Sequence, residues 1–251
     1  MLASGSGGNS TLVRSGSTAI IVDCGISCRE LGRRLDLVDA AAENLSAILL
    51  THDHADHVRG VAVASRRLGA PVYANRDTSR RASPGHGGPP LQIFDTARPF
   101  EVGAFIVTPF AVPHDTSDPV GFTISDGTAR LGVATDLGSV TLEVLSGLSG
   151  CDAVIVESNH DRGMLLEGPY PWHLKRRVDG PTGHLSNDDA ATIIESVRHG
   201  GLRHVVLAHL SRTNNEPELS IRSAQRALGL MSGRVHVSVG RHDRPGELIR
   251  L

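Results

Sequence analysis

The sequence has few of the residues that bind nucleic acid over a broad surface. Lys175 is the only lysine, aromatic residues make up 3% of the chain, and the formal net charge is −2. The chain therefore lacks a global basic field, and so few rings exclude an extended platform for stacking bases. Basic side chains do gather locally, as at residues 175–177, where they form either a solvated helix face or the flank of a polyanion groove.

Cysteine and long apolar runs are also scarce. The three cysteines, Cys24, Cys28 and Cys151, show no zinc-ribbon or redox spacing, so we expect buried, inert thiols in a reducing cytosol. No apolar run approaches the ~18 residues of a transmembrane helix, and the Gly/Ser-rich start lacks the apolar segment of a signal peptide. These absences predict a soluble, cytoplasmic protein without a membrane partner.

Short apolar runs that predict strands alternate with helical periodicity along the chain. The predicted strands are residues 11–13, 19–23, 47–50, 71–74, 105–112, 120–125, 130–134, 153–156, 204–208 and 235–239. The predicted helices are residues 28–37, 58–68, 142–148, 171–178, 188–198 and 218–228, and residues 78–90 are a predicted exposed loop. Because no linker separates the halves, we expect a single domain over residues 1–251, with two packed sheets and helices outside.

Residues 51–57 carry the densest chemical signal, three histidines and two aspartates directly after an apolar run. Imidazole and carboxylate are the usual ligands of zinc and similar divalent ions. His52 and His54 can project together from an extended turn, while Asp56 and His57 face a second point nearby. This spacing favours two adjacent metal ions over one, and over a solvated loop that is merely rich in histidine.

Further candidate ligands follow predicted strands later in the chain. They are His114, Asp136 and His209. A single histidine after a strand is usually no more than a polar strand end. Side chains at the carboxyl ends of several strands can, however, converge on one edge of a sandwich. Together with residues 51–57 they indicate a metal centre.

This order of ligands resembles that of metallo-β-lactamase-fold hydrolases, in which His-x-His-x-Asp-His is followed by His, Asp and His. The resemblance covers nearly the whole chain and implies an α+β fold, an αββα sandwich of two mixed sheets packed face to face with helices outside. It implies one metal ion on His52, His54 and His114, a second on Asp56, His57 and His209, and Asp136 as the bridge. Two divalent ions, zinc or manganese, would lower the pKa of a bound water to ~7 and supply a nucleophile. Asp53 is not a ligand in this pattern and suits a supporting contact.

Glu157 and His184 resemble a pair found in the phosphodiesterase branch of these hydrolases, which includes ribonuclease Z. The resemblance implies that Glu157 orients His184, which protonates the leaving oxygen, with Asp56 also in the catalytic set. The alternative for His184 is a polar helix cap. The resemblance narrows to the YycJ/WalJ-like group, associated with 5′-exonuclease action on single-stranded DNA and with DNA repair, at residues 2–11, 23–27, 157–161, 169–172 and 183–187.

Candidate contacts for a substrate phosphate are chosen by their position near these motifs. They are Asn9, His160, Ser186, Asn187, Ser211 and Arg212. Asn9 lies in a Gly-rich loop whose backbone N–H groups can meet phosphate, and residues 186–187 precede a predicted helix. Each residue alone could equally be a cap or turn residue. Tyr170 and Trp172 either stack on one base or pack in the core.

The expected function is a dinuclear-metal phosphodiesterase, a 5′-exonuclease on single-stranded DNA whose partner is single-stranded nucleic acid. The alternative is a small-molecule or cyclic phosphodiesterase, or another metal-dependent hydrolase, on the same fold. The near-neutral charge slightly favours a small-molecule substrate. A metal-stabilised binding or regulatory protein is a third possibility. The full ligand set with an orienting pair argues against it, since structure alone requires less.

Overall fold

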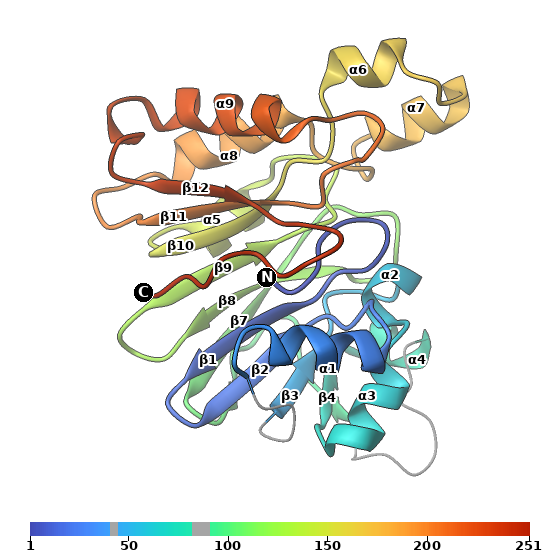
Figure 1. The fold of residues 1–251 in the computed structure, drawn as a ribbon, viewed down its shortest axis with the longest axis vertical. Helices are drawn as coiled ribbons and strands as arrows, with labels where there is room; N and C mark the ends of the chain where they lie inside the picture. Colours follow the sequence, from blue (N-terminus) through green and yellow to red (C-terminus); the bar gives the residue numbers. More distant parts are fainter. Residues whose placement is uncertain (41–44, 82–90) are drawn as a thin grey trace.

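Two β-sheets form the centre of the computed structural model, which describes residues 1–40, 45–81 and 91–251 (Figure 1). The first sheet has the order β1-β2-β3-β4-β5. Its strands are β1 (Thr11–Ser15), β2 (Thr18–Val22), β3 (Leu45–Leu49), β4 (Val72–Ala74) and β5 (Gln92–Ile93). β1 pairs antiparallel with β2, and the remaining neighbours are parallel.

The second sheet has the order β12-β11-β10-β9-β8-β7-β6. Its strands are β6 (Phe100–Val102), β7 (Phe105–Ala111), β8 (Val120–Ser125), β9 (Arg130–Ala134), β10 (Ala153–Glu157), β11 (His204–Ala208) and β12 (His236–Val239). The pairs from β6 to β9 are antiparallel, and those from β9 to β12 are parallel. Both sheets are therefore mixed.

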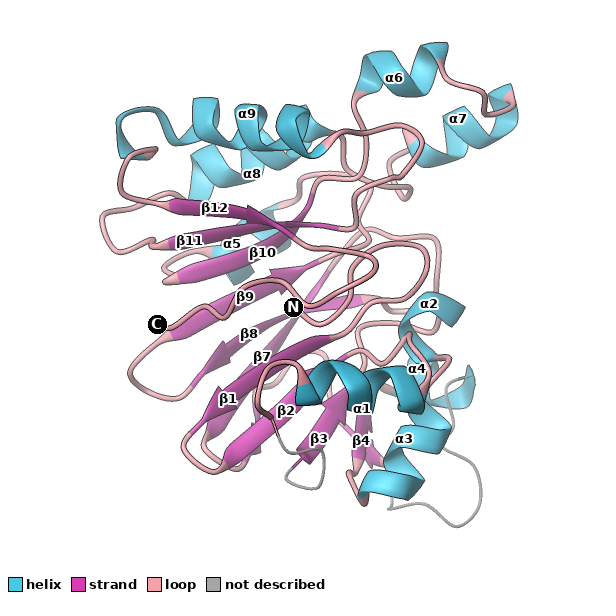
Figure 2. Ribbon diagram, in the orientation of Figure 1, coloured by secondary structure: helices cyan, strands magenta, loops and turns pink. Residues whose placement is uncertain are grey.

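Helices cover the outer faces of the two sheets (Figure 2). The helices of the described residues are α1 (Cys28–Asp36), α2 (Ala55–Val58), α3 (Val61–Leu68), α4 (Arg76–Arg81), α5 (Leu142–Leu148), α6 (Arg162–Glu167), α7 (Trp172–Val178), α8 (Asn187–Val197) and α9 (Pro217–Leu228), which the 3₁₀ turn Gly229–Met231 follows. α1 and α3 pack on the first sheet, and α5, α8 and α9 on the second. The predicted αββα sandwich is confirmed.

Successive side chains of β2 point to opposite faces of the sheet, and both faces are covered, so the whole strand is buried. Ile20 packs between the sheets with Phe122 of β8, whereas Ile21 faces the other way and packs against Leu31 of α1. A fully buried side chain of this size stabilises the fold by roughly 1.5–3 kcal/mol. The sandwich therefore has a core between the sheets and a further core under each helical layer.

Two predicted elements differ from the structure. The helix expected over residues 58–68 is broken at Gly60, so α2 and α3 are separate. The Gly60 N–H donates to the carbonyl of Cys24 at 2.8 Å, and a Cβ there would lie 1.9 Å from the Ile26 oxygen. The start of the expected loop 78–90 is helical, because residues 76–81 form α4. The side chain of Asn75, just before this helix, accepts the Thr78 N–H at 2.8 Å. The rest of that expected loop lies outside the described residues.

The thiols largely match the expectation. Cys24 and Cys151 are buried, which raises the pKa of Cys24 to about 12 and that of Cys151 to about 11. Both thiols therefore stay protonated and inert. Cys28 is only half-buried. Among the described helices, none combines the length and apolar character that crossing a membrane requires.

Candidate metal centre

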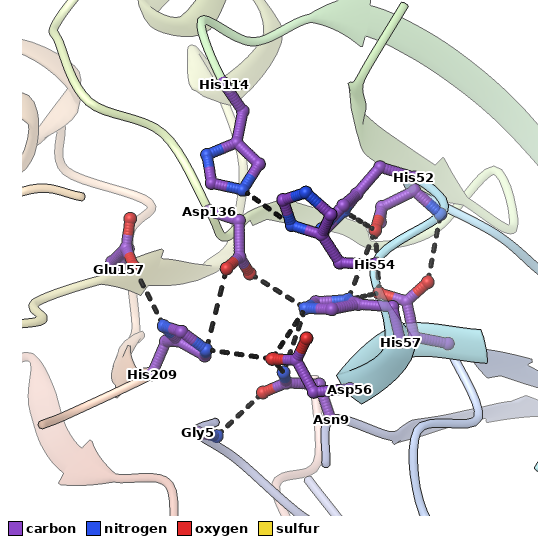
Figure 3. A network of polar contacts seen from close by, with 12 residues as sticks. Gly5, Asn9, His52, His54, Asp56, His57, His114, Asp136, Glu157 and His209 are labelled. Atoms are coloured by element: carbon purple, nitrogen blue, oxygen red, sulfur yellow. Dashed lines mark hydrogen bonds and ion pairs between the residues drawn. The ribbon is translucent and has the colours of Figure 1, made fainter. Parts of the chain in front are cut away.

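The chain brings the predicted metal ligands together at one edge of the sandwich (Figure 3). His52 and His54 follow β3, and Asp56 and His57 lie in α2. The remaining predicted ligands come after β7, β9 and β11 and are His114, Asp136 and His209. These strands all end at the same edge, so sequence positions far apart meet there.

The first group of ligand atoms comes from His52, His54 and His114, whose ligand atoms lie within 4.8 Å of one another. His114 Nε2 lies 3.2 Å from His54 Nδ1, and the His114 Nδ1 contacts the carbonyl of Gly183 at 3.1 Å. His52 Nε2 is buried and has no hydrogen-bond partner among the described residues. A buried imidazole nitrogen without a partner is unfavourable unless a ligand takes its lone pair.

The second group comes from Asp56, His57, Asp136 and His209. His57 Nε2 lies 3.0 Å from Asp136 Oδ2, and His209 Nε2 lies 3.5 Å from the other Asp136 oxygen. Asp56 Oδ2 is 3.4 Å from the same His209 nitrogen. Asp136 therefore faces two histidines with both of its oxygens.

These donor sets fit divalent metal ions. Atoms bound to one ion at about 2.0–2.2 Å can lie at most about 4.4 Å apart. The ligand atoms of each group lie within 4.8 Å, so a small contraction would suffice. Imidazole and carboxylate suit zinc and manganese alike. A bound ion would take the free lone pair of His52 and offset the negative charge of the buried Asp136.

The electrostatics of the second group show how strongly it holds positive charge. Burial alone would lower the pKa of His209, but Asp136 and other carboxylates outweigh it and raise that pKa to about 10. The same competition raises the pKa of His57 well above its usual value, through Asp136 and Asp23. Burial would raise the pKa of Asp136, but the neighbouring histidines hold it well below its usual range. Protons occupy positions here that a metal ion would take over.

Asp23 and Thr51 position the ligands, and sequence reasoning gave neither of them a role. Asp23 Oδ2 accepts a hydrogen bond from His57 Nδ1 at 2.8 Å and one from the Thr51 hydroxyl at 2.8 Å. The Thr51 oxygen also lies 2.9 Å from His52 Nδ1. Asp23 therefore fixes the ring of a ligand from behind, as carboxylates do around metal-bound histidines. The available signals were its place at the end of a predicted strand and at the start of segment 23–27, which carries the resemblance.

Glu157 and His184 lie beside this centre as the resemblance implies. Glu157 is fully buried, and its Oε1 lies 2.8 Å from His184 Nδ1 and 3.0 Å from His209 Nδ1. Burial would lower the pKa of His184, but the charge of Glu157 outweighs it and raises that pKa. In the same way His184 contributes to lowering the pKa of Glu157 to about 2. Because Nδ1 of His184 faces Glu157, Nε2 is the ring nitrogen left to hold a second proton.

Asn9 lies against the second ligand group. Its Nδ2 is 3.2 Å from Asp56 Oδ2 and 2.9 Å from His57 Nε2, and its Oδ1 accepts the N–H of Gly5 at 2.7 Å (Figure 3). Asn9 thus ties the Gly-rich loop to the metal edge, while its contact with a phosphate stays a prediction. Asp53, expected in a supporting role, accepts a hydrogen bond from the Thr116 hydroxyl.

Other predicted phosphate contacts are turned into the protein. His160 is buried with its Nε2 3.4 Å from Asp179. Ser186 is the N-cap of α8 in a capping box with Asp189, and Asn187 bonds to the side chain of Ser158 at 2.6 Å. These contacts support the loops behind His184. Their placement disfavours direct binding of a substrate, and their contact with a phosphate stays a prediction.

Ser211 and Arg212 follow the last ligand. The Ser211 hydroxyl accepts the N–H of Asn214 at 3.1 Å, which makes it a turn residue. Arg212 is exposed, and its guanidinium lies beside Gly7 in the Gly-rich loop. Arg212 therefore presents its charge beside the Gly-rich loop that carries Asn9.

Comparison with known proteins is consistent with this geometry. Residues 18–210 match the family described as the beta-lactamase superfamily domain. The chain is 35% identical to exodeoxyribonuclease YycJ of Bacillus anthracis, over 91% of this chain and 88% of the relative. It is 32% identical to exodeoxyribonuclease WalJ of Streptococcus pneumoniae, over 88% of this chain and 84% of the relative. The crystal structure of the metallo-beta-lactamase fold protein YhfI from Bacillus subtilis superposes with a TM-score of 0.75 at 18% identity, covering 96% and 95% of the two chains.

Proposed function

This chain belongs to the beta-lactamase superfamily, in which it is a metal-dependent hydrolase of the YycJ/WalJ type, and from that premise we propose that it is a 5′-exonuclease acting on single-stranded DNA. The two curated relatives are named exodeoxyribonucleases, and the match spans most of each chain. We further propose a role in DNA repair, a cytoplasmic location in which its thiols stay reduced, and a single domain over residues 1–251.

The contact between Glu157 and His184 is the observation that supports phosphodiester cleavage. Nδ1 of His184 donates to Glu157 at 2.8 Å, which fixes the tautomer and leaves Nε2 to hold a proton. Nδ1 of His184 also lies 3.8 Å from Asp136, which belongs to the metal-ligand set. A group so placed can protonate an oxygen that leaves from phosphorus beside the metal centre. Proton donation of this kind contributes about 10²–10⁴-fold to a rate.

The metal ions would be held by the two ligand groups, with His52, His54 and His114 on one ion and Asp56, His57 and His209 on the other, joined by Asp136. When bound, two divalent ions supply an activated water and stabilise charge on the phosphoryl oxygens. We take these ions to be zinc or manganese, because both accept this donor set. The protein's own side chains then orient the ligands, position the substrate and hold the proton for the leaving group.

The test is an end-labelled cleavage assay with metal-replete protein on single- and double-stranded DNA, RNA and cyclic nucleotides. We expect mononucleotides to be released from the 5′ end of a 5′-phosphorylated single strand. His184→Ala should retain its metal ions and cleave about 10²–10⁴-fold more slowly. The control is His236→Ala, which removes an exposed histidine on β12 and should cleave at the wild-type rate.

Three results would contradict the proposal. Release of internal fragments or of 3′-terminal nucleotides would refute the 5′-exonuclease activity. Cleavage of cyclic nucleotides with oligonucleotides left intact would make the chain a small-molecule phosphodiesterase. Full activity of His184→Ala would refute the assignment of His184 as the proton donor, although metal-dependent hydrolysis would still stand.

A further inference from the structure

Residues 161–181, here termed the α6–α7 arm, project from the sandwich on the side of the metal centre (Figure 1). The arm joins the region of Glu157 to His184 and contains the short helices α6 and α7. In Figure 1 it extends past the ends of the sheets on the same side as α2, which carries two of the predicted ligands. None of its residues is a predicted metal ligand or takes part in the proposed proton transfer.

The inner end of the arm is fastened to the metal edge. Arg177 binds Asp115, the residue after His114, with its Nη2 at 2.7 Å and its Nε at 2.9 Å. The backbone N–H of His184 donates to the carbonyl of Val178 at 2.8 Å. These contacts tie α7 to residues on both sides of the site.

Close packing makes this connection rigid. A Cβ at Gly183 would lie 2.1 Å from the Arg177 oxygen and 2.3 Å from the Val178 oxygen, so only glycine fits. The Ser139 hydroxyl donates to the Pro181 carbonyl at 3.0 Å, which fastens the turn to the loop after Asp136. The arm therefore holds a set position beside the site.

The outer surface of α7 combines an exposed ring with an unpaired charge. Trp172 is 60% exposed, which excludes the core-packing alternative. Arg176 follows four residues later, on the same face of the helix, and is exposed with no ion pair to any described residue. Two acidic side chains near α7 are engaged, since Asp179 pairs with Arg162 and Asp115 with Arg177, while Glu167 at the end of α6 is exposed. The face is therefore apolar and positive.

We propose that this face binds a single strand of nucleic acid, with one base stacked on Trp172 and a neighbouring phosphate paired with Arg176. The inference rests on the proposed function and names the surface that holds its substrate. A flat ring next to a cation matches the alternation of base and phosphate along a single strand. Bases in a duplex are stacked on one another, so this contact selects single strands. One ring implies a grip on one base, which agrees with the low aromatic content.

The test uses the fact that Trp172 is the only tryptophan of the chain. Its fluorescence is followed while metal-replete protein is titrated with a phosphorothioate-linked single strand, which resists cleavage. Stacking should quench the emission, and a duplex of the same sequence should not. Trp172→Ala, measured by anisotropy of a labelled strand, should bind about 5- to 100-fold more weakly. The loss in cleavage should fall mainly on KM.

Matched controls separate this face from the rest of the surface. Leu230→Ala removes another exposed apolar side chain, and Arg222→Gln removes an exposed arginine from α9; both should bind like the wild type. Arg176→Gln should lower the slope of log Kd against log salt concentration by about 0.7, as expected for one phosphate contact on a single strand.

The outcomes distinguish the surface from the proposed function. An unchanged Kd for Trp172→Ala would overturn the proposed binding surface and leave the proposed 5′-exonuclease activity intact. Quenching of the Trp172 emission without cleavage of any strand would overturn the proposed exonuclease activity and support the proposed binding surface. A change in oligomeric state on Trp172→Ala, with the Kd unchanged, would make the face an interface between copies of the chain and overturn the proposal.

Discussion

Replacing Glu157 by glutamine should impair metal binding and turnover together. Glu157 is buried and accepts from four donors, the ring nitrogens of His184 and His209 at 2.8 and 3.0 Å and the backbone N–H groups of Leu137 and Leu185 at 2.9 and 3.3 Å. A carboxylate accepts at both oxygens, whereas an amide accepts at one atom and donates at the other. In either orientation, the NH₂ group of the glutamine would therefore face two N–H donors, either the two histidine rings or the two backbone N–H groups.

The cost of that conflict depends on which groups yield. A buried donor left without an acceptor costs about 1–3 kcal/mol. His209 could escape by moving its proton to Nε2, but that nitrogen faces Asp56 and Asp136 and is the one that a metal ion would need. We therefore expect metal affinity to fall about 10–100-fold, the usual effect of losing a carboxylate behind a ligand. His184 would lose its orientation too, which should slow turnover about 10²–10⁴-fold at saturating metal.

A chelator competition gives the metal affinity, and single-turnover cleavage of an end-labelled single strand at saturating metal gives the rate. The double variant Glu157→Gln/His184→Ala tests the link between the two residues. If Glu157 affects the rate through His184, the double variant should be no slower than His184→Ala alone. Wild-type metal affinity together with a wild-type rate would refute the reasoning, provided that circular dichroism shows a folded variant.

The remaining predictions concern the ligands and the packing around them. Asp23→Asn should lower metal affinity about 10–100-fold by loosening the ring of His57; an unchanged affinity in the chelator competition would count against this role. Metal affinity should rise with pH. Burial lowers the pKa of His57 less than the nearby carboxylates raise it, so His57 keeps its proton at every pH below that raised pKa. A metal ion must displace this proton, which becomes easier as the pH rises. Calorimetry in buffers of different ionisation enthalpy measures the protons released, and a count of zero would contradict the prediction. Gly60→Ala should cost about 1–3 kcal/mol or more of unfolding free energy, because its Cβ would meet the carbonyl of Ile26 at 1.9 Å. A Cβ at Gly32 in α1 would meet open space, so Gly32→Ala should instead raise the free energy of unfolding by about 0.5–1 kcal/mol. Equal stability of the two variants in urea unfolding would refute the packing argument.

The fold was predictable where local pattern and tertiary environment agree. The apolar runs at residues 130–134 and 204–208 coincide with β9 and β11, because both strands are buried in the middle of a sheet. β5 escaped prediction because its two residues are exposed and show no apolar pattern. The break at Gly60 escaped because it depends on a contact with Cys24, which lies far away in the sequence.

The candidate site divides in the same way. Ligand chemistry is visible in the residue types, so His52 and Asp136 could be selected from the sequence. Contacts that depend on where a loop folds back could not. Ser186 is the N-cap of α8 and Asn187 is its first residue, and the side chains of both bond inward. The ion pair of Arg177 with Asp115 joins positions 62 residues apart, which no local pattern shows.

Backbone strain at the site suggests that the ligands are positioned before a metal ion arrives. Asp23, Asp136 and His209 have φ values of 59°, 60° and 55°, each just beyond the end of a strand. Such left-handed conformations cost a non-glycine residue roughly 1–2 kcal/mol, although aspartate and histidine adopt them more readily than most. They persist only where surrounding contacts hold them. At His209 the N–H donates to the Ser4 hydroxyl at 2.7 Å, and the carbonyl accepts from Asn159 at 2.8 Å. Since these contacts use only the backbone atoms of His209, the fold itself sustains the turn that directs the ring toward Asp56 and Asp136, without a metal ion.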